Sequence, residues 1–431
     1  MRSMSLPALL RSFPLVATAT LASASTAQGA IWVVDDDGGP GVDFQQVQDA
    51  INAAADGDTV LVRDGNYADF QVVNKTLALV ADSGASVVAD AIDIQGLAPD
   101  GVVSLRGFES TELVIDGCEG TVWIEEHLST GGAPAGRIQQ SDDVVVIGST
   151  FQGRSGNQWT LFLPFAVPAE GLVVTGSTVH MYDVSISGGG GGSGVQEAKN
   201  GQSGETGLVA TGGFLYLSGA IAVGGGGGSG YSATILDPFS SDSCGNGGSG
   251  APGAVLFGDA QLVQRDTIFG GGFGGSGGKV TELFTGVPVI VQQCPDGSDA
   301  VPFGFGVGST NTEILRPHRA FTVNSPAREG ETLTLSFEGE PGDLAFLFVS
   351  FGAVPFYNQP CGGSVLFDPT AFFTVATTPV DAQGLATLAV PVPVFGPQPA
   401  LHLYVQANFV DTLGACNVSS GSALTLLDAS L

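Results

Sequence analysis

Two acidic residues occupy the same place in a repeating pattern of this chain, and ring-bearing residues stand close to them. Glu126 and Asp183 each lie five residues before the first glycine of a Gly-rich ending, while Trp123, His180 and Tyr216 each lie eight residues before one. Carboxylates hold sugar hydroxyls or carry out acid–base chemistry, and aromatic rings stack on the faces of sugars. The pattern predicts a glycan-binding face, with Glu126 and Asp183 as the catalytic candidates if the protein is an enzyme.

The pattern itself is a fivefold repeat. Five tracts end in a Val/Ile-rich run, a polar turn and a Gly-rich close, whose first glycines are Gly131, Gly153, Gly188, Gly224 and Gly270. The first two glycines are 22 residues apart, about one turn of a three-stranded parallel β-solenoid, and the later spacings are longer by the length of Gly-rich inserts. Each repeat is therefore expected to form one coil of a solenoid.

The repeat also predicts which side chains face the core. The residue seven before each of these glycines is always aliphatic, and we expect it inside: Ile124, Val146, Met181, Leu217 and Val263. Since side chains alternate along a strand, the preceding residue must face outwards: Trp123, Val145, His180, Tyr216 and Leu262.

Stacked coils set the distance between the two carboxylates. Coils lie about 4.8 Å apart, so Glu126 and Asp183, two coils apart, should be separated by about 10 Å. That slightly exceeds the roughly 6.5 to 9.5 Å of an inverting glycosidase pair, although the reach of the side chains could close the gap.

The start of the mature chain, IWVVDDDGGPGVDFQQVQDAINAAADGDTVLVRDGNY, predicts a short amphipathic helix between two strands, with Asp43 and Gln46 as its capping box. This segment resembles the start of secreted right-handed parallel β-helix proteins of the pectin-lyase-like class, specifically over Ile31 to Tyr67 and more weakly to about Gly277. The resemblance implies a right-handed parallel β-helix with an N-terminal capping helix, and an exported location. It implies no single activity, because the class includes lyases, hydrolases, adhesins and proteins without a known reaction.

The character of the chain changes after about Ile314. The Gly-rich tracts end there, and apolar residues alternate between Gly, Pro and Asp turns, which predicts a β-sandwich over residues 314–431. The expected organisation is all-β: a signal peptide over residues 1–29, a parallel β-helix with Gly-rich loop inserts over residues 30–313, and the sandwich as an accessory domain.

The N-terminus and the cysteines predict the compartment. Arg2 and Arg11, an apolar run and small residues near position 29 are typical of a signal peptide, so we expect bacterial-type export to the extracellular space or the cell surface. No later stretch is apolar for long enough to span a bilayer. We expect disulfides Cys361–Cys416 in the C-terminal region and Cys244–Cys294 between neighbouring loops, with Cys118 as a buried free thiol.

Charge limits the partners. The chain has 42 acidic and 13 basic residues and a net charge of −29, which repels nucleic acid and anionic membranes. Polysaccharide or a cell-envelope glycan is the partner class that fits. Asp35, Asp36 and Asp37 offer oxygen ligands for calcium, although a run along one strand points alternate carboxylates to opposite sides and favours a solvated turn. No other cofactor is implied.

Catalytic signatures are sparse. The Gly-rich tracts lack the strand–helix context of a nucleotide-binding loop, which favours a flexible or turn-forming spacer. Asp142 and Asp143 resemble the adjacent aspartates of β-helix polygalacturonases, but the Gly-His-Gly and Arg-x-Lys elements of that family are missing. The sequence therefore predicts a secreted or cell-surface β-helix protein with a structural or glycan-binding role and no turnover. The alternative is an extracellular polysaccharide lyase or glycoside hydrolase that uses the face bearing Trp123 and Glu126.

Overall fold

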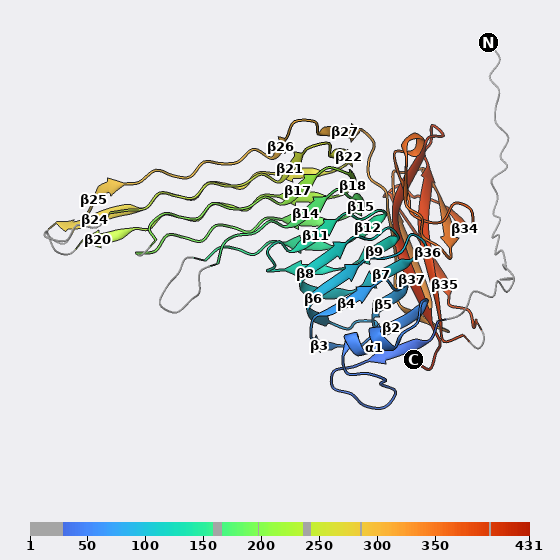
Figure 1. The fold of residues 1–431 in the computed structure, drawn as a ribbon. Coiled ribbons are helices and arrows are strands. Elements are labelled where there is room, and N and C mark those ends of the chain that lie inside the picture. Colours follow the sequence, from blue (N-terminus) through green and yellow to red (C-terminus); the bar gives the residue numbers. More distant parts are fainter. Residues whose placement is uncertain (1–28, 158–165, 197, 236–242, 285–286, 396–397) are drawn as a thin grey trace, which may run out of the picture.

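The chain is mostly β-structure, with parallel sheets wound as a β-helix and further sheets at the C-terminal end (Figure 1). This computed structural model describes residues 29–157, 166–196, 198–235, 243–284, 287–395 and 398–431. The predicted signal peptide, apart from Gly29, lies outside the described residues. None of the helices in these ranges has the length and apolar character needed to cross a membrane.

One long parallel sheet runs the full height of the β-helix. It contains ten strands, each paired in register with the strand of the next coil. In spatial order they are β1 (Ile31–Val34), β2 (Asp58–Val62), β5 (Leu77–Ala81), β7 (Val102–Arg106), β9 (Thr121–Glu125), β12 (Val144–Ile147), β15 (Thr178–Tyr182), β18 (Phe214–Ser218), β22 (Gln261–Arg265) and β27 (Thr310–Ile314). We call this sheet the long sheet.

A 14-stranded sheet forms the remaining wall of the coils. Its strands β6 (Val87–Gln95) and β8 (Phe108–Asp116) are long enough to serve both flanks, which separate in the later coils. One flank holds β3 (Gly65–Tyr67), β10 (Leu128–Thr130), β13 (Thr150–Gln152), β16 (Ser185–Ser187), β19 (Ile221–Val223) and β23 (Ile268–Gly270). The other holds β4 (Phe70–Val73), β11 (Gly136–Gln139), β14 (Leu172–Thr175), β17 (Leu208–Thr211), β21 (Ala254–Phe257) and β26 (Phe303–Phe305).

The predicted core column is correct for four coils and wrong for the fifth. Ile124, Val146, Met181 and Leu217 follow one another in register and are fully buried. Leu217 pairs with Gln264 and not with Val263, so Leu262 faces the core and Val263 faces outwards. The shift arises because Gly270 pairs with Val223, which makes the second glycine of that tract, not the first, the equivalent of Gly224.

The helix α1 (Val47–Ala53) closes the N-terminal end of the core with Val47, Ala50 and Ile51 buried. Its predicted capping box is wrong: the Asp43 carboxylate instead accepts a hydrogen bond from the backbone N–H of Val33 at 2.9 Å, and Gln46 makes no side-chain cap. The acidic residue therefore ties the approach to the helix onto β1.

The Gly-rich inserts form layers that project from the β-helix on the side away from the C-terminal sheets (Figure 1). Each insert runs outwards and returns, through 188–195 and 198–207, then 224–231 and 244–253, then 271–279 and 293–302. We call these three inserts the arm. A three-stranded sheet, β20 (Ala233–Ile235), β24 (Lys279–Phe284) and β25 (Val287–Gln293), forms its far end.

The C-terminal region has a core of its own between two sheets, with Phe321, Phe337, Leu347 and Phe409 among its buried residues. One sheet contains β28 (Ala320–Val323), β30 (Thr332–Glu338) and β35 (Leu385–Pro391). The other contains β29 (Ala327–Arg328), β37 (Cys416–Leu427), β36 (Ala400–Val410), β31 (Leu344–Ser350) and β34 (Phe372–Pro379). A hairpin of β32 (Phe356–Asn358) and β33 (Gly363–Val365) surrounds the short 3₁₀ turn Gln359–Cys361.

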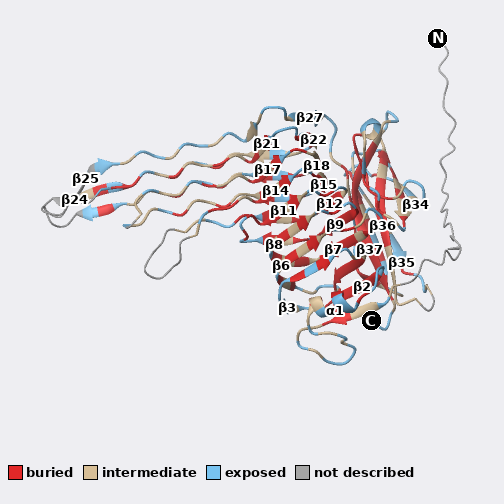
Figure 2. Ribbon diagram, in the orientation of Figure 1, coloured by how far each residue is buried: buried red, intermediate tan, exposed pale blue. Residues whose placement is uncertain are grey.

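The C-terminal sheets lie directly against the outer face of the long sheet, and both surfaces are buried there (Figure 2). Trp123, Val145 and Tyr182 of the β-helix share one apolar cluster with Leu366 and Tyr404 of the C-terminal region. The two parts of the chain are therefore packed against each other through side chains as large as tryptophan.

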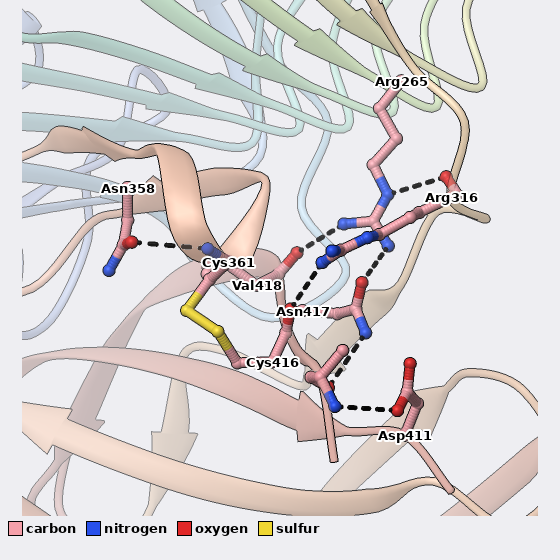
Figure 3. Close-up of a disulfide and its surroundings, with 9 residues drawn as sticks. Arg265, Arg316, Asn358, Cys361, Asp411, Cys416, Asn417 and Val418 are labelled. Carbon is pink, nitrogen blue, oxygen red and sulfur yellow. Dashed lines mark hydrogen bonds between the residues drawn. A yellow bond between two sulfur atoms is a disulfide. The ribbon is translucent and has the colours of Figure 1, made fainter. Parts of the chain in front are cut away.

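Two disulfides join the pairs expected from the sequence. Cys361–Cys416 links the 3₁₀ turn to the start of β37 (Figure 3), and Cys244–Cys294 links neighbouring layers of the arm. Cys118 is a buried free cysteine, and burial raises the pKa of its thiol.

Candidate functional site

The predicted ladder of rings exists, but it is not a surface. Trp123, His180 and Tyr216 lie in one column of the long sheet and point away from the core, as their register requires. Each is at most 1% exposed, because the C-terminal sheets cover them. The prediction of an exposed glycan-binding ladder is therefore wrong. Strand alternation determines on which face of the sheet a side chain lies, but not whether another part of the chain packs on that face.

Each of the three rings is held by a residue of the C-terminal region. The indole of Trp123 packs on Tyr404 with ring centroids 5.1 Å apart, and His180 Nδ1 lies 2.7 Å from the Ser364 hydroxyl. The Tyr216 hydroxyl donates to the carbonyl of Gly362 at 3.1 Å. The two polar contacts engage His180 Nδ1 and the Tyr216 hydroxyl, whereas His180 Nε2 is buried without a hydrogen-bond partner among the described residues, which carries a desolvation cost. The column is thus an internal seam.

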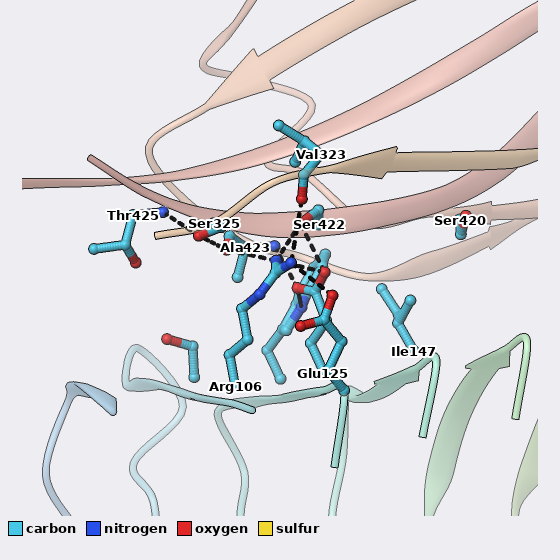
Figure 4. Close-up of polar contacts among 12 residues, drawn as sticks. Arg106, Glu125, Ile147, Val323, Ser325, Ser420, Ser422, Ala423 and Thr425 are labelled. Atoms are coloured by element: carbon cyan, nitrogen blue, oxygen red, sulfur yellow. Dashed lines mark hydrogen bonds and ion pairs between the residues drawn. The ribbon is translucent and has the colours of Figure 1, made fainter. Parts of the chain in front are cut away.

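A buried ion pair of the β-helix, Arg106 with Glu125, is hydrogen-bonded across the same seam to the C-terminal region (Figure 4). Arg106 donates to Glu125 at 2.7 Å and also to the Ser422 hydroxyl at 2.7 Å. Glu125 in turn accepts from the Ser422 hydroxyl and from the backbone N–H of Ala423, at 2.7 and 2.8 Å. Burial raises the pKa of the Glu125 carboxyl, although Arg106 and these hydrogen bonds oppose the shift. Each of these charged groups is therefore committed to holding the C-terminal sheets.

A second arginine performs the same task near the disulfide Cys361–Cys416 (Figure 3). Arg265 is fully buried and donates to the carbonyls of Arg316, Pro317 and Val418 and to the side chain of Asn417. Although Arg265 lies five residues before Gly270, it pairs with Ser218 inside β22 and does not occupy the corner equivalent to Glu126 and Asp183. The one-residue shift in this coil gives that position to Asp266.

Glu126 and Asp183, the candidate catalytic pair, occupy equivalent corners two coils apart. Both have left-handed backbone conformations, with φ of 52° and 55°, and the equivalent residues between and beyond them are Gly148 and Gly219. Their conformation is therefore a property of the corner and needs no catalytic explanation. Glu126 pairs with Arg106 at 2.8 Å, whereas Asp183 lies 2.9 Å from His318 Nε2. The two carboxylates face different partners.

The buried histidines are poor acid–base candidates. Burial lowers the pKa of His127, His180 and His402 to about 4, so all three are neutral near pH 7. His402 lies 3.1 Å from the Ser104 hydroxyl and 2.9 Å from that of Thr425. Like His180, it belongs to the seam between the β-helix and the C-terminal sheets.

The acidic run at residues 35–37 forms part of the N-terminal turn. Asp35 pairs with Arg63 at 3.5 Å, and the Asp36 carboxylate accepts from the backbone N–H of Asn66 at 2.9 Å. Asp37 is held through its backbone N–H, which donates to Asp35. In the part of the chain that the structure describes, no three His, Cys, Asp or Glu side chains gather as metal ligands.

An open pocket of about 380 Å³ lies at the edge of the seam, and sequence reasoning did not anticipate it. It sits where β5, β7 and β9 end, and contains the turn after β5, Arg106, Gly107 and Glu126. The segment from Val323 to Pro326 of the C-terminal region closes its other side. The pocket therefore forms only where the two parts of the chain meet, and no local pattern could have revealed it.

The arm is held together by its backbone. In its outgoing segments, Gly191 N–H donates to the Gly226 carbonyl at 2.7 Å, and Gly227 N–H donates to that of Phe273 at 2.8 Å. Outgoing and returning segments are joined as well: Gly248 donates to Gly228 at 2.8 Å and accepts from Gly275 at 2.7 Å. The prediction of a flexible or turn-forming spacer did not include this layered hydrogen bonding.

Glycine is required in the arm because neighbouring backbones approach too closely for a side chain. A Cβ on Gly248 would lie 1.8 Å from the Gln202 carbonyl oxygen, and one on Gly227 would lie 1.9 Å from that of Gly248. At Gly226 the nearest atom would be 3.4 Å away, and the equivalent residue in the next layer is Phe273, which is exposed. Glycine thus recurs where chains meet, as it does in collagen, and other residues stand where the surface is free.

Two aspartates end the stack of layers. Asp299 and Asp296 occupy positions that are glycines in the two preceding layers, as the pairing of β17, β21 and β26 shows. Their carboxylates accept from the N–H groups of Gly274 and Gly277, at 2.8 and 2.6 Å. In the preceding layer, the equivalent amides of Gly227 and Gly230 donate to the carbonyls of Phe273 and Ser276 in the next layer. The last outgoing segment is therefore capped by side chains.

Comparisons with known proteins give only a distant likeness. No family model and no curated protein matches the chain. The full-length tailspike protein 2 of Escherichia coli O157:H7 bacteriophage CAB120 is 10% identical, with a TM-score of 0.26. That match covers 89% of this chain and 66%, just under two thirds, of the tailspike. The enzymatically active domain of tailspike protein 2 of bacteriophage CBA120 is 10% identical, with a TM-score of 0.23, and the match covers 89% of this chain and 74% of that domain. At these scores the likeness carries no argument about activity.

Proposed function

We propose that this protein is an extracellular or cell-surface β-helix protein with a structural and glycan-binding role, and that it turns over no substrate. The observation that carries this proposal is the arm. Three inserts are hydrogen-bonded in layers and project away from the packed body of the protein, and Cys244–Cys294 links the second insert to the third. Such a construction keeps a distant surface at a fixed position, which a flexible spacer does not.

The inserts are not needed to close a coil, and this supports a functional reason for their length. The corner that follows β10 passes through Gly131 to Ala135 and returns to β11 at Gly136 without an insert. The later coils make the same connection with inserts of tens of residues. Longer loops add little closure entropy, so the cost of the arm lies mainly in ordering its backbone.

The partners of the carboxylates favour binding over turnover. Glu125 is enclosed in the seam, Glu126 is paired with Arg106, and Asp183 is next to His318. A glycosidase needs two carboxyl groups on either side of one bond, with one of them free to donate a proton. Held by separate partners, Glu126 and Asp183 do not offer that arrangement.

Export is the part of the proposal that rests on the sequence and the disulfides together. Residues 1–29 have the features of a bacterial-type signal peptide, and disulfides persist in oxidising compartments. We also propose that the resemblance of Ile31 to Tyr67 to the pectin-lyase-like class reflects a shared fold, and that residues 30–313 and 314–431 are the two structural units. A polysaccharide or cell-envelope glycan is the proposed partner.

The experiment compares retention with product formation. The mature chain, residues 30–431, is passed over columns of neutral and acidic polysaccharides to measure retention. The protein is also incubated with the same polysaccharides in solution, and the mixtures are assayed for new reducing ends and unsaturated sugars. We expect retention on at least one glycan without products. Products above background would replace this proposal with a polysaccharide lyase or glycoside hydrolase, and the absence of both retention and products would refute the glycan-binding role.

A further inference from the structure

The pocket at the edge of the seam has an arrangement suited to a small polar ligand. It lies at the carboxyl ends of three adjacent parallel strands of the long sheet. Asp82 follows β5, Gly107 follows β7 and Glu126 follows β9. Gly107 leaves the middle of these three corners without a side chain.

Both carboxylates that line the pocket are paired with arginines. Glu126 is paired with Arg106 through Oε1, and its side chain is still 56% exposed. Asp82 is paired with Arg328 through Oδ1 at 2.7 Å. In a chain of net charge −29, the pocket is thus a local surface whose two carboxylates are both paired with guanidinium groups, that of Arg106 in the lining and that of Arg328 beside it. It suits a ligand that is neutral and rich in hydroxyl groups better than an anion or a bare cation.

The remaining walls fit the same class of ligand. Val323 and Pro326 of the C-terminal region, with Ala81 and Ala85 of the β-helix, supply apolar surface for the C–H face of a sugar ring. Ser83 and Asn324 add polar groups beside it. A volume of about 380 Å³ is at the lower end of the range for ligand pockets, which favours one end of a glycan over the middle of a long chain.

We infer that this pocket binds the terminal sugar of a neutral glycan, with hydroxyl groups donating to the carboxylates of Glu126 and Asp82. This assignment rests on the proposed glycan-binding role and gives it a location. Arg106 acts as a positioning residue, because it fixes the Glu126 carboxylate at 2.8 Å while its other nitrogen holds Glu125. Since the C-terminal segment 323–326 forms one wall, the site exists only in the assembled protein.

The test uses the full mature chain and ligand-observed NMR with a panel of neutral monosaccharides and short oligosaccharides, plus a uronic acid. Glu126→Gln removes one charged acceptor and should weaken binding of the neutral sugar about tenfold or more. Ser83→Trp places a large side chain in the mouth of the pocket from an exposed turn and should abolish binding. The matched control is Asp183→Asn, which neutralises the carboxylate at the same corner two coils away and should bind like the wild type. Melting temperatures show whether each variant is folded. If Glu126→Gln does not fold, the binding result for Ser83→Trp alone tests the pocket assignment.

The outcomes separate the site from the function. Neutral sugar bound equally by the wild type, Glu126→Gln and Ser83→Trp would overturn the pocket assignment while the glycan-binding role stands. Preference for the uronic acid, or binding only with added calcium, would overturn the chemical class. If the wild type binds no member of the panel and no polysaccharide column retains it, both the pocket assignment and the glycan-binding role fail.

Discussion

Gly248 and Gly226 form a matched pair for testing how the arm is built. Both are glycines of the second insert, and neither has the positive φ that would penalise alanine by itself. They differ in their surroundings: a Cβ on Gly248 would lie 1.8 Å from the Gln202 oxygen, whereas one on Gly226 would lie 3.4 Å from its nearest neighbour, the Phe273 oxygen.

The expected magnitude follows from those distances. Real Cβ contacts essentially never fall below 3.0 Å, so Gly248→Ala must displace a neighbouring backbone. Overpacking of a dense site costs about 1 to 3 kcal/mol. The displacement also strains two hydrogen bonds, from Gly248 to Gly228 and from Gly275 to Gly248, each of which contributes about 0.5 to 1.5 kcal/mol. We therefore expect Gly248→Ala to destabilise the arm locally by about 3 kcal/mol and Gly226→Ala to change its stability by less than about 0.5 kcal/mol.

Hydrogen–deuterium exchange measures this difference, because it reports local opening free energies residue by residue. The amides of Gly228, Gly248 and Gly275 should exchange about a hundredfold faster in Gly248→Ala than in the wild type, while the β-helix amides stay protected. If the two alanine variants exchange alike, the close packing described for the arm is incorrect.

Three further perturbations test the seam and the cap of the arm. Trp123→Ala removes a fully buried indole and should lower the free energy of unfolding by about 3 to 5 kcal/mol in denaturant titration, whereas an unchanged value would mean that the ring is on the surface. Acidification should weaken the seam: the folded pKa values of His180 and His402 are about 4, below the unfolded value near 6.5, so their stabilisation is complete above about pH 6.5 and is lost as the pH falls towards 4. Each histidine adds at most about 1.4 kcal/mol per pH unit to the slope of unfolding free energy against pH, so His180→Gln and His402→Gln should each flatten that slope. The raised pKa of Glu125 contributes a slope of the opposite sign. The double change Asp296→Gly, Asp299→Gly uncovers the amides of Gly274 and Gly277 and should cause concentration-dependent association in sedimentation velocity, while the asparagine pair keeps the acceptor oxygens and should sediment like the wild type.

The repeat in the sequence was sufficient to predict the coils because each coil has its own local signal. Ile124, Val146, Met181 and Leu217 are all apolar residues in one column, and the structure confirms their register. The register predicted for the fifth coil was wrong by one residue because that tract has three consecutive glycines. The sequence does not mark which of the three is equivalent to Gly224.

The site could not be predicted in the same way because it depends on contacts distant in the sequence. Trp123 points outwards as expected, but its covering partner Tyr404 lies about 280 residues further along the chain. An outward aromatic column is equally consistent with a glycan surface and with a domain interface. The available sequence signal for the interface was a pair of opposite charges, Arg106 and Glu125, which are register partners at outward positions of the long sheet beside the rings.

For the arm, the sequence does contain a pattern that indicates layered packing, but the high glycine content suggests a flexible linker instead. Glycine-rich tracts are flexible in isolation, yet when the inserts are aligned by coil they share Gly-Gly-Ser in the outgoing segments and place Asp296 and Asp299 where the earlier layers have glycine. A three-residue period of small residues indicates chains packed side by side. That period distinguishes a layered structure from a linker.

Small-angle X-ray scattering of the mature chain tests whether the inserts form a rigid arm projecting from a body to which the C-terminal sheets are fixed. The comparison is a variant whose three inserts are shortened to the five-residue corner seen at residues 131–135. We expect the wild type to give the scattering of a rigid elongated particle matching Figure 1, and the shortened variant to give that of a compact one. A wild-type profile with the high-angle plateau of a flexible chain, lost on shortening, would contradict this expectation.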